Sequence, residues 1–222
     1  MDGTTPGQYF EPEPTVASRR RTVQLTLPDV ALELTADSGV FSGDRVDAGT
    51  KLLLLEAPPP PPTGDLLDLG CGYGPIALTL SHRSPGATVW AVDVNERAVA
   101  LCAENAAAAG RTNVRVIAAA DPEAAESQGL APDVRFAAIY SNPPIRVGKA
   151  ALHDLLTGWL ARLAPDGVAH LVVQKHLGSD SLARWLTDQG WPTSRVVSRA
   201  GYRILTVARS APISPAPAEG QA

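Results

Sequence analysis

The sequence predicts an α/β fold in which a seven-stranded, mostly parallel sheet carries helices on both faces, preceded by a short N-terminal β-hairpin. From Asp65 onward, apolar runs of strand length alternate with segments of helix length, a pattern typical of a parallel sheet covered on both faces. Near the end of the chain, two strand-like segments are separated only by Ala200 and Gly201. A turn this tight pairs strands antiparallel, so the sheet should finish with an antiparallel C-terminal strand.

The segment before the sheet predicts a hairpin followed by a short helix. TVQLTL and VALELTA both alternate polar and apolar residues, and Pro28 and Asp29 between them turn the chain. Asp47 begins a capping segment for a short helix through Leu55. Five prolines at 58–62 then form a stiff spacer.

The sheet region divides into strands and helices by its apolar pattern and its breakers. An Ala-rich helix ends at Gly110, which supplies a C-cap, and the Pro165-Asp166-Gly167 segment is expected to turn the chain into the fifth strand. The predicted strands are 65–70, 87–93, 113–119, 134–141, 168–174, 194–199 and 202–209, and the predicted helices are 75–83, 95–110, 149–164 and 179–190.

These elements suggest one main domain with short additions. A chain of 222 residues with 45% hydrophobic content is long enough for one well-buried domain and short for two. The predicted organisation is a disordered N-terminus at 1–18, the hairpin and short helix at 19–57, a Pro-rich linker at 58–64, the main domain at 65–210 and a disordered tail at 211–222.

Composition excludes several classes of function. The formal net charge of −4 offers no global attraction to nucleic acid, so a polyanion would have to meet a local basic patch. The two cysteines, Cys71 and Cys102, have no metal-ligand spacing, and the four histidines are scattered, so no metal is expected. No secretory leader and no apolar run of membrane-spanning length are apparent. A cytoplasmic protein without a membrane partner is expected.

A glycine loop at 68–74, Asp-Leu-Gly-Cys-Gly-Tyr-Gly, carries the strongest chemical signal. Its glycines, Gly70, Gly72 and Gly74, let backbone approach a ligand, and the helix that follows offers unpaired N–H groups. A dinucleotide fingerprint would need glycine where Pro75 stands, and would not need the acid Asp68. An acid at the strand end instead suits a cationic amino acid ligand, although a tight turn without a ligand is the alternative.

Two further acids follow strand ends. Asp93, followed by Val94, ends the second strand, from where a carboxylate can accept both hydroxyls of a ribose. Asp121 follows the third strand and could reach an adenine amino group. Each also suits a simpler role, Asp93 as a helix cap and Asp121, with Pro122 behind it, as the start of a helix.

The segment Ser141-Asn142-Pro143-Pro144-Ile145 ends the fourth strand. Two prolines hold the turn stiff and donate no backbone hydrogen bond, so the Asn142 oxygen and the Pro143 carbonyl are expected to face the crevice as acceptors. Such a pair grips an N–H₂ group and favours a pyramidal nitrogen, which helps a conjugated amine to attack. The alternative is a rigid turn in which Asn142 caps the next helix.

These motifs, with SGVFSGDRVDAGTKLL, PDGVAHLVVQK and GYRILTV, resemble the class I S-adenosylmethionine-dependent methyltransferases of the small-domain family, specifically the small-subunit ribosomal RNA guanine-N2 group. The resemblance covers about 22–209 and implies a Rossmann-like fold with S-adenosyl-L-methionine as cofactor. It implies cofactor binding by Asp68, Gly70, Cys71, Gly72, Gly74, Asp93, Val94, Asp121 and Asn142, catalysis by Asn142, Pro143 and Pro144, substrate binding by Ile145, Arg146 and Lys149, and closure of the pocket by Phe41 and Thr50.

The sequence departs from that family in two respects. Related nitrogen methyltransferases often carry Tyr or Phe after the two prolines to stack on the substrate ring, where this chain has Ile145. Better-known members also carry a second N-terminal domain, so RNA docking here would use another surface or a homodimer. Candidate phosphate contacts are Arg146, Lys149, Lys175 and residues 19–21, all of which could equally be solvated surface charge.

The expected function is therefore methyl transfer to an exocyclic amino group of an RNA base, most simply guanine N2 in small-subunit ribosomal RNA. Ribosomal RNA or the small ribosomal subunit is the expected partner, and the protein is expected to be a monomer or homodimer. A methyltransferase for protein glutamine side chains, one for small molecules, and a binding paralogue without catalysis are the alternatives.

Overall fold

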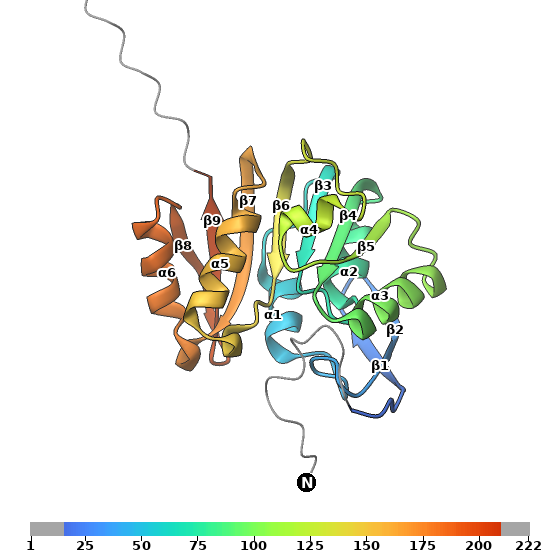
Figure 1. The fold of residues 1–222 in the computed structure, drawn as a ribbon. Coiled ribbons are helices and arrows are strands. Elements are labelled where there is room, and N and C mark those ends of the chain that lie inside the picture. The colour runs from blue at the N-terminus through green and yellow to red at the C-terminus, as the bar shows by residue number, and fades with distance from the viewer. Residues whose placement is uncertain (1–15, 210–222) are drawn as a thin grey trace, which may run out of the picture.

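The computed structural model describes residues 16–209 and contains a seven-stranded sheet in the order β5-β4-β3-β6-β7-β9-β8 (Figure 1). The first five of these strands are parallel, and β9 runs antiparallel to both β7 and β8. Its strands are β3 (Thr63–Leu69), β4 (Gly86–Asp93), β5 (Val114–Ala118), β6 (Phe136–Ser141), β7 (Leu163–Gln174), β8 (Thr193–Arg199) and β9 (Tyr202–Ala208). The predicted fold class is confirmed.

Helices cover both faces of this sheet. Leu66, Ala138 and Tyr140 point into one apolar cluster with α1, α2 and α3, whereas Leu67 and Ile139 point into another with α4, α5 and α6. Successive residues of a strand face opposite sides, so a strand between two helix layers is apolar throughout. The helices are α1 (Ala48–Glu56), α2 (Pro75–Arg83), α3 (Glu96–Ala108), α4 (Pro122–Glu126), α5 (Lys149–Leu160), α6 (Ser179–Asp188) and the short 3₁₀ helices η2 (Ile145–Val147) and η3 (Lys175–Leu177).

The N-terminal hairpin packs beside α3 (Figure 1). Its strands, β1 (Arg21–Thr26) and β2 (Ala31–Ala36), pair antiparallel and bury alternate residues against the sheet domain. Asn105 of α3 accepts from the Thr35 amide at 2.8 Å, and its Nδ2 donates to the carbonyls of Thr35 and Tyr73 at 2.9 and 2.8 Å. One buried amide thus joins the hairpin to the glycine loop.

Two predicted boundaries are wrong around β6 and β7. The helix predicted over 149–164 ends at Leu160, and the predicted turn at 165–167 lies within β7 as an irregularity. The strand begins early because the Phe136 amide donates to the Arg162 carbonyl at 2.8 Å, before the register shifts from Phe136–Leu163 to Ala138–Val168. Gly167 suits this bulge, since a Cβ there would lie 2.5 Å from the Phe136 carbonyl oxygen.

The remaining differences are small. β3 begins at Thr63, inside the predicted linker, because Thr63 and Gly64 pair with Gly86 and Ala87. Of the predicted disordered ends, residues 1–15 and 210–222 lie outside the described residues, while Ser18 Oγ donates to Asp37 at 2.6 Å. None of the helices in 16–209 combines the length and apolar character that crossing a membrane requires.

Candidate active site

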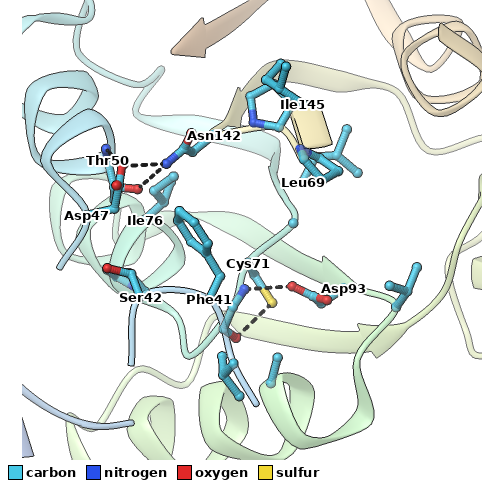
Figure 2. A pocket seen from close by; sticks show the side chains of 18 of the residues that line it. Phe41, Ser42, Asp47, Thr50, Leu69, Cys71, Ile76, Asp93, Asn142 and Ile145 are labelled. Atoms are coloured by element: carbon cyan, nitrogen blue, oxygen red, sulfur yellow. Dashed lines mark hydrogen bonds between the residues drawn. The ribbon is translucent and has the colours of Figure 1, made fainter. Parts of the chain in front are cut away.

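A cavity of about 270 Å³ lies where β3, β4 and β6 end (Figure 2). The carboxyl ends of neighbouring parallel strands meet at one edge of a sheet, which brings the three predicted motifs together. Ten of the residues predicted to bind cofactor or substrate or to take part in catalysis line it: Gly70, Cys71, Gly72, Asp93, Val94, Asn142, Pro143, Pro144, Ile145 and Arg146. Phe41 and Thr50 also line it, whereas Asp68, Gly74, Asp121 and Lys149 do not.

The glycine loop forms one wall of this cavity and leaves space beside its backbone. The amides of Gly70 and Cys71 donate to the Val92 carbonyl at 2.8 and 3.0 Å, which ties the loop to the end of β4. Gly70 and Gly72 have φ angles of 77° and 55°, and a Cβ at either position would meet no atom within 4 Å. Both glycines therefore satisfy a left-handed backbone and leave space for a ligand.

Gly74 serves packing instead. It lies at the N-cap of α2 with φ of 99°, and a Cβ there would come within 2.8 Å of Leu78 and 2.9 Å of the Cys102 sulfur. The residue thus allows α2 to approach α3 closely. It does not line the cavity, and its predicted contact with the cofactor stays a prediction.

Asp68 is buried beneath the glycine loop and does not line the cavity, and its role toward a ligand stays a prediction. Its side chain is fully buried, and its Oδ2 accepts from the Ala77 amide at 2.8 Å. Its Oδ1 has no hydrogen-bond partner within the described part of the chain. Burial raises its pKa to about 8, opposed by the Ala77 amide and assisted by the negative charge of Asp93.

Asp93 faces the cavity with both carboxylate oxygens held by backbone. Oδ2 accepts from the Gly72 amide at 2.8 Å (Figure 2). Oδ1 accepts from the Asn95 amide at 3.0 Å. Burial raises its pKa, and the backbone donors at Asn95, Gly72 and Val94 oppose that rise. Asn95, and not Asp93, caps α3, by accepting from the Ala98 amide.

Asp121 caps a helix and does not reach the cavity. Its Oδ1 accepts from the Ala124 amide at 2.8 Å at the start of α4, and its side chain is exposed. Ala119, two residues earlier, occupies the cavity wall instead. Asp121 thus takes the helix-start role, and its contact with an adenine amino group stays a prediction.

Asn142 lies at the other end of the cavity and is held by residues at the start of α1. Its Nδ2 donates to Asp47 Oδ1 at 2.8 Å and to Thr50 Oγ1 at 3.0 Å (Figure 2). Neither η2 nor α5 has a side-chain cap, which excludes the capping alternative for Asn142. The Pro143 carbonyl, expected to be a free acceptor, already accepts from the Ile145 amide at 2.8 Å.

Three residues that line the cavity were not among the predicted site residues. The sequence predicts Asp47 only as a helix cap and gives no role to Gln174 or Tyr202, although all three line the cavity. Gln174 Nε2 donates to the Tyr202 hydroxyl at 3.0 Å across the β7–β9 pair. Gln174 could have been found from its position at the end of a strand. Tyr202 could not, because it reaches Gln174 only through the antiparallel pairing of β7 with β9.

The predicted RNA contacts fall into two groups. Arg20 pairs with Glu104 at 2.6 Å and Arg21 pairs with Asp44, so these two cations already have carboxylate partners. Arg146, Lys149 and Lys175 are close to the cavity in sequence or in space, and none makes an ion pair with another residue of 16–209. Arg19, the remaining candidate, is exposed and likewise makes no ion pair within 16–209, but it does not line the cavity.

Comparison with known proteins agrees with this geometry. The chain is 36% identical to the uncharacterized protein YbxB of Bacillus subtilis (strain 168), over 89% of this chain and 96% of that protein. It is also 36% identical to ribosomal RNA small subunit methyltransferase C of Shewanella halifaxensis, over 72% of this chain but only 46% of that protein. The chain thus spans less than half the length of that methyltransferase.

A solved structure extends the likeness to three dimensions. The 16S rRNA N2 G1207 methyltransferase RsmC of T. thermophilus, in complex with AdoMet and guanosine, superposes with a TM-score of 0.71. It is 25% identical, over 89% of this chain and 52% of that one. Residues 31–206 match the family described as Methyltransferase small domain, which confirms the resemblance found in the sequence. The chain belongs to the methyltransferase small domain family.

Proposed function

We propose that the protein transfers a methyl group from S-adenosyl-L-methionine to an exocyclic amino group of an RNA base, guanine N2 of small-subunit ribosomal RNA. One observation carries this proposal: the glycine loop, Asp93 and the Asn142-Pro143 turn share one cavity. A cofactor site next to a rigid amine-binding turn is the arrangement that N-methyl transfer requires. Ribosomal RNA as substrate would place the reaction in the cytoplasm.

The cavity fits the proposed cofactor at its loop end. Open space next to Gly70 and Gly72 suits close approach of the amino acid part, and the Asp93 carboxylate has lone pairs left for ribose hydroxyls. The cofactor, when bound, supplies a methyl group activated by a sulfonium. AdoMet in the T. thermophilus RsmC structure supports the same choice.

Asn142 and its prolines would act on the target amine. The amide oxygen of Asn142 would accept a hydrogen bond from the N–H₂ group of the amine and orient its nitrogen, while Pro143 and Pro144 keep the turn rigid. No protein nucleophile is needed. The hydrogen bond to Cys102, together with burial, raises the pKa of Cys71, so this thiol in the loop stays protonated.

RNA as the acceptor is supported by the relatives and by the charge at the cavity mouth. Arg146 lines the cavity, and Lys149 begins α5 three residues later. Lys175 begins η3, whose Leu177 lines the same cavity. Three cations without carboxylate partners in 16–209 suit phosphate contacts in a chain of net charge −4.

Nucleoside mass spectrometry of ribosomal RNA from a deletion strain tests the reaction. We expect loss of one N2-methylguanosine, restored by the wild-type gene and not by Asn142→Ala. An unchanged nucleoside profile would overturn the proposal. The purified protein is then incubated with labelled cofactor and either small ribosomal subunits or a cell extract that supplies proteins and small molecules. The molecules that become labelled identify the class of acceptor.

The docking surface is tested by salt dependence of RNA affinity. Lys149→Glu and Lys175→Glu should each weaken binding and lower the slope of log K against log salt by about 1. Arg184→Glu is the matched control, because Arg184 is an exposed cation of α6 that does not line the cavity. Equal effects of all three substitutions would indicate nonspecific charge alone.

A further inference from the structure

Two residues outside the parallel sheet contact the side chain that the proposed reaction depends on. Asp47 and Thr50 lie at the start of α1, in the segment that precedes the sheet, and both line the cavity. Figure 2 shows their oxygens facing the nitrogen of the Asn142 amide. That nitrogen lies 2.8 Å from Asp47 Oδ1 and 3.0 Å from Thr50 Oγ1. Thr50 is buried, and Asn142 and Asp47 are half-buried.

These contacts determine which end of the amide is available. Asn142 Nδ2 carries two protons, and each has an acceptor at the start of α1. The amide oxygen then remains for a hydrogen bond from a target amine. If the amide turned over, its N–H₂ would face the N–H₂ of the substrate, and its oxygen would face a carboxylate that has no proton to donate. Asp47 therefore selects the orientation that the reaction needs.

The charge of Asp47 adds to this effect. A hydrogen bond to a carboxylate is shorter and stronger than one to a neutral acceptor, and it polarises the amide that donates it. Polarisation places more negative charge on the Asn142 oxygen, which makes that oxygen a better acceptor. Thr50, a neutral acceptor in the first turn of α1, contributes direction without charge.

Asp47 also has a structural role that must be separated from this one. The same Oδ1 accepts from the amides of Gly49 and Thr50 at 2.8 and 3.1 Å, which makes Asp47 the N-cap of α1. A cap needs only these two bonds, and serine forms them as well as aspartate does. The Oγ of serine lies closer to the backbone and does not reach Asn142.

We propose that Asp47 and Thr50 are positioning residues that hold the Asn142 amide with its oxygen toward the acceptor amine. The consequence for activity rests on the proposed function of Asn142, while the contact itself does not. The N-terminal segment thus completes the site built by the sheet.

Substitutions that keep the cap separate the two roles. Asp47→Ser should leave the Tm and the affinity for S-adenosylmethionine near wild type and lower kcat by about 10- to 100-fold, the range expected for a misplaced group. Thr50→Val should lower kcat less. Asp47→Asn keeps the cap and an acceptor oxygen, so it should recover most of the kcat that is lost in Asp47→Ser. Asp133→Ser is the matched control, because it makes the same change at an exposed aspartate away from the cavity.

A double-mutant cycle tests whether Asp47 acts through Asn142. Asp47→Ser should cost nothing further in an Asn142→Ala background, because the contact is already lost. Additive losses of kcat would overturn the proposal, as would a wild-type kcat for Asp47→Ser.

A readout independent of activity tests the contact. The side-chain ¹⁵N–¹H₂ signals of Asn142, assigned by their loss in Asn142→Ala, should shift and exchange faster in Asp47→Ser and stay unchanged in Asp133→Ser. Unchanged signals in Asp47→Ser would overturn the proposed contact. If no RNA is methylated but these signals respond as expected, the proposed function fails and the positioning of Asn142 stands.

Discussion

Asp68→Asn should change how the stability of the protein depends on pH. The wild-type carboxyl is fully buried, and burial raises its pKa from 3.8 to about 8. The substitution removes the ionisable group but keeps an oxygen that can accept from the Ala77 amide. The variant should therefore lose the pH dependence that this buried acid imposes.

The direction in which stability changes with pH follows from proton binding. A carboxyl whose pKa is raised by folding holds its proton in the folded protein over a range where the unfolded chain has lost it. Stability therefore falls as pH rises between the two pKa values, by about 1.4 kcal/mol per pH unit. From pH 5 to pH 8, wild type should lose on the order of 4 kcal/mol relative to Asp68→Asn. The difference should level off above the folded-state pKa of about 8.

Urea denaturation at each pH unit from 5 to 9 measures this difference. The change with pH is the diagnostic quantity, because the amide that Asp68→Asn introduces adds a constant cost for its own unpaired N–H group. Asp133→Asn, which removes an exposed carboxyl, is the control. Parallel curves for wild type and Asp68→Asn would refute the reasoning, because they would show that Asp68 ionises alike in both states.

Three further predictions concern packing around the site and the core. Trp159→Ala should lower the free energy of unfolding by about 3–5 kcal/mol, since the ring is fully buried between α5 and the sheet. Gly49→Ala should reduce turnover, because the new Cβ would lie 2.6 Å from the Tyr202 ring at the cavity wall. Cys71 and Cys102 are both buried, so a thiol reagent at pH 8 should label neither in the native protein and both in urea.

Each of these has a clear contrary result. A loss of less than 1 kcal/mol in Trp159→Ala, or a loss as large in exposed Val196→Ala, would contradict the assigned core. Full turnover in Gly49→Ala would show that Tyr202 moves freely. Rapid labelling of Cys71 in the native protein would show that the glycine loop opens in solution.

Much of the site could be predicted because its motifs are local. The glycine loop follows β3, Asp93 ends β4 and Asn142 follows β6, so each motif is set by neighbours in the chain. Parallel strands place their carboxyl ends along one edge, and that general rule brought these three motifs to one cavity. The helix start at Asp121 was equally local, and the structure shows the side chain in that capping role.

Other features depend on distances between parts of the chain that no local pattern specifies. The predicted end of α5 was wrong because pairing of β7 with β6 decides where that helix stops. The sequence around Asp68 is the same whether its side chain faces a ligand or is buried beneath the glycine loop. Only the packing of α2 shows that the side chain is buried.

The sequence by itself determined the fold class, the family and the three motifs of the cavity, because turns, caps and apolar periodicity act over a few residues. Tertiary structure alone decided that Asp47 reaches Asn142 across 95 positions of the chain and that Tyr202 meets Gln174. Such contacts arise when separate elements pack on a common core, since burial of apolar surface, and not sequence proximity, sets how they lie together.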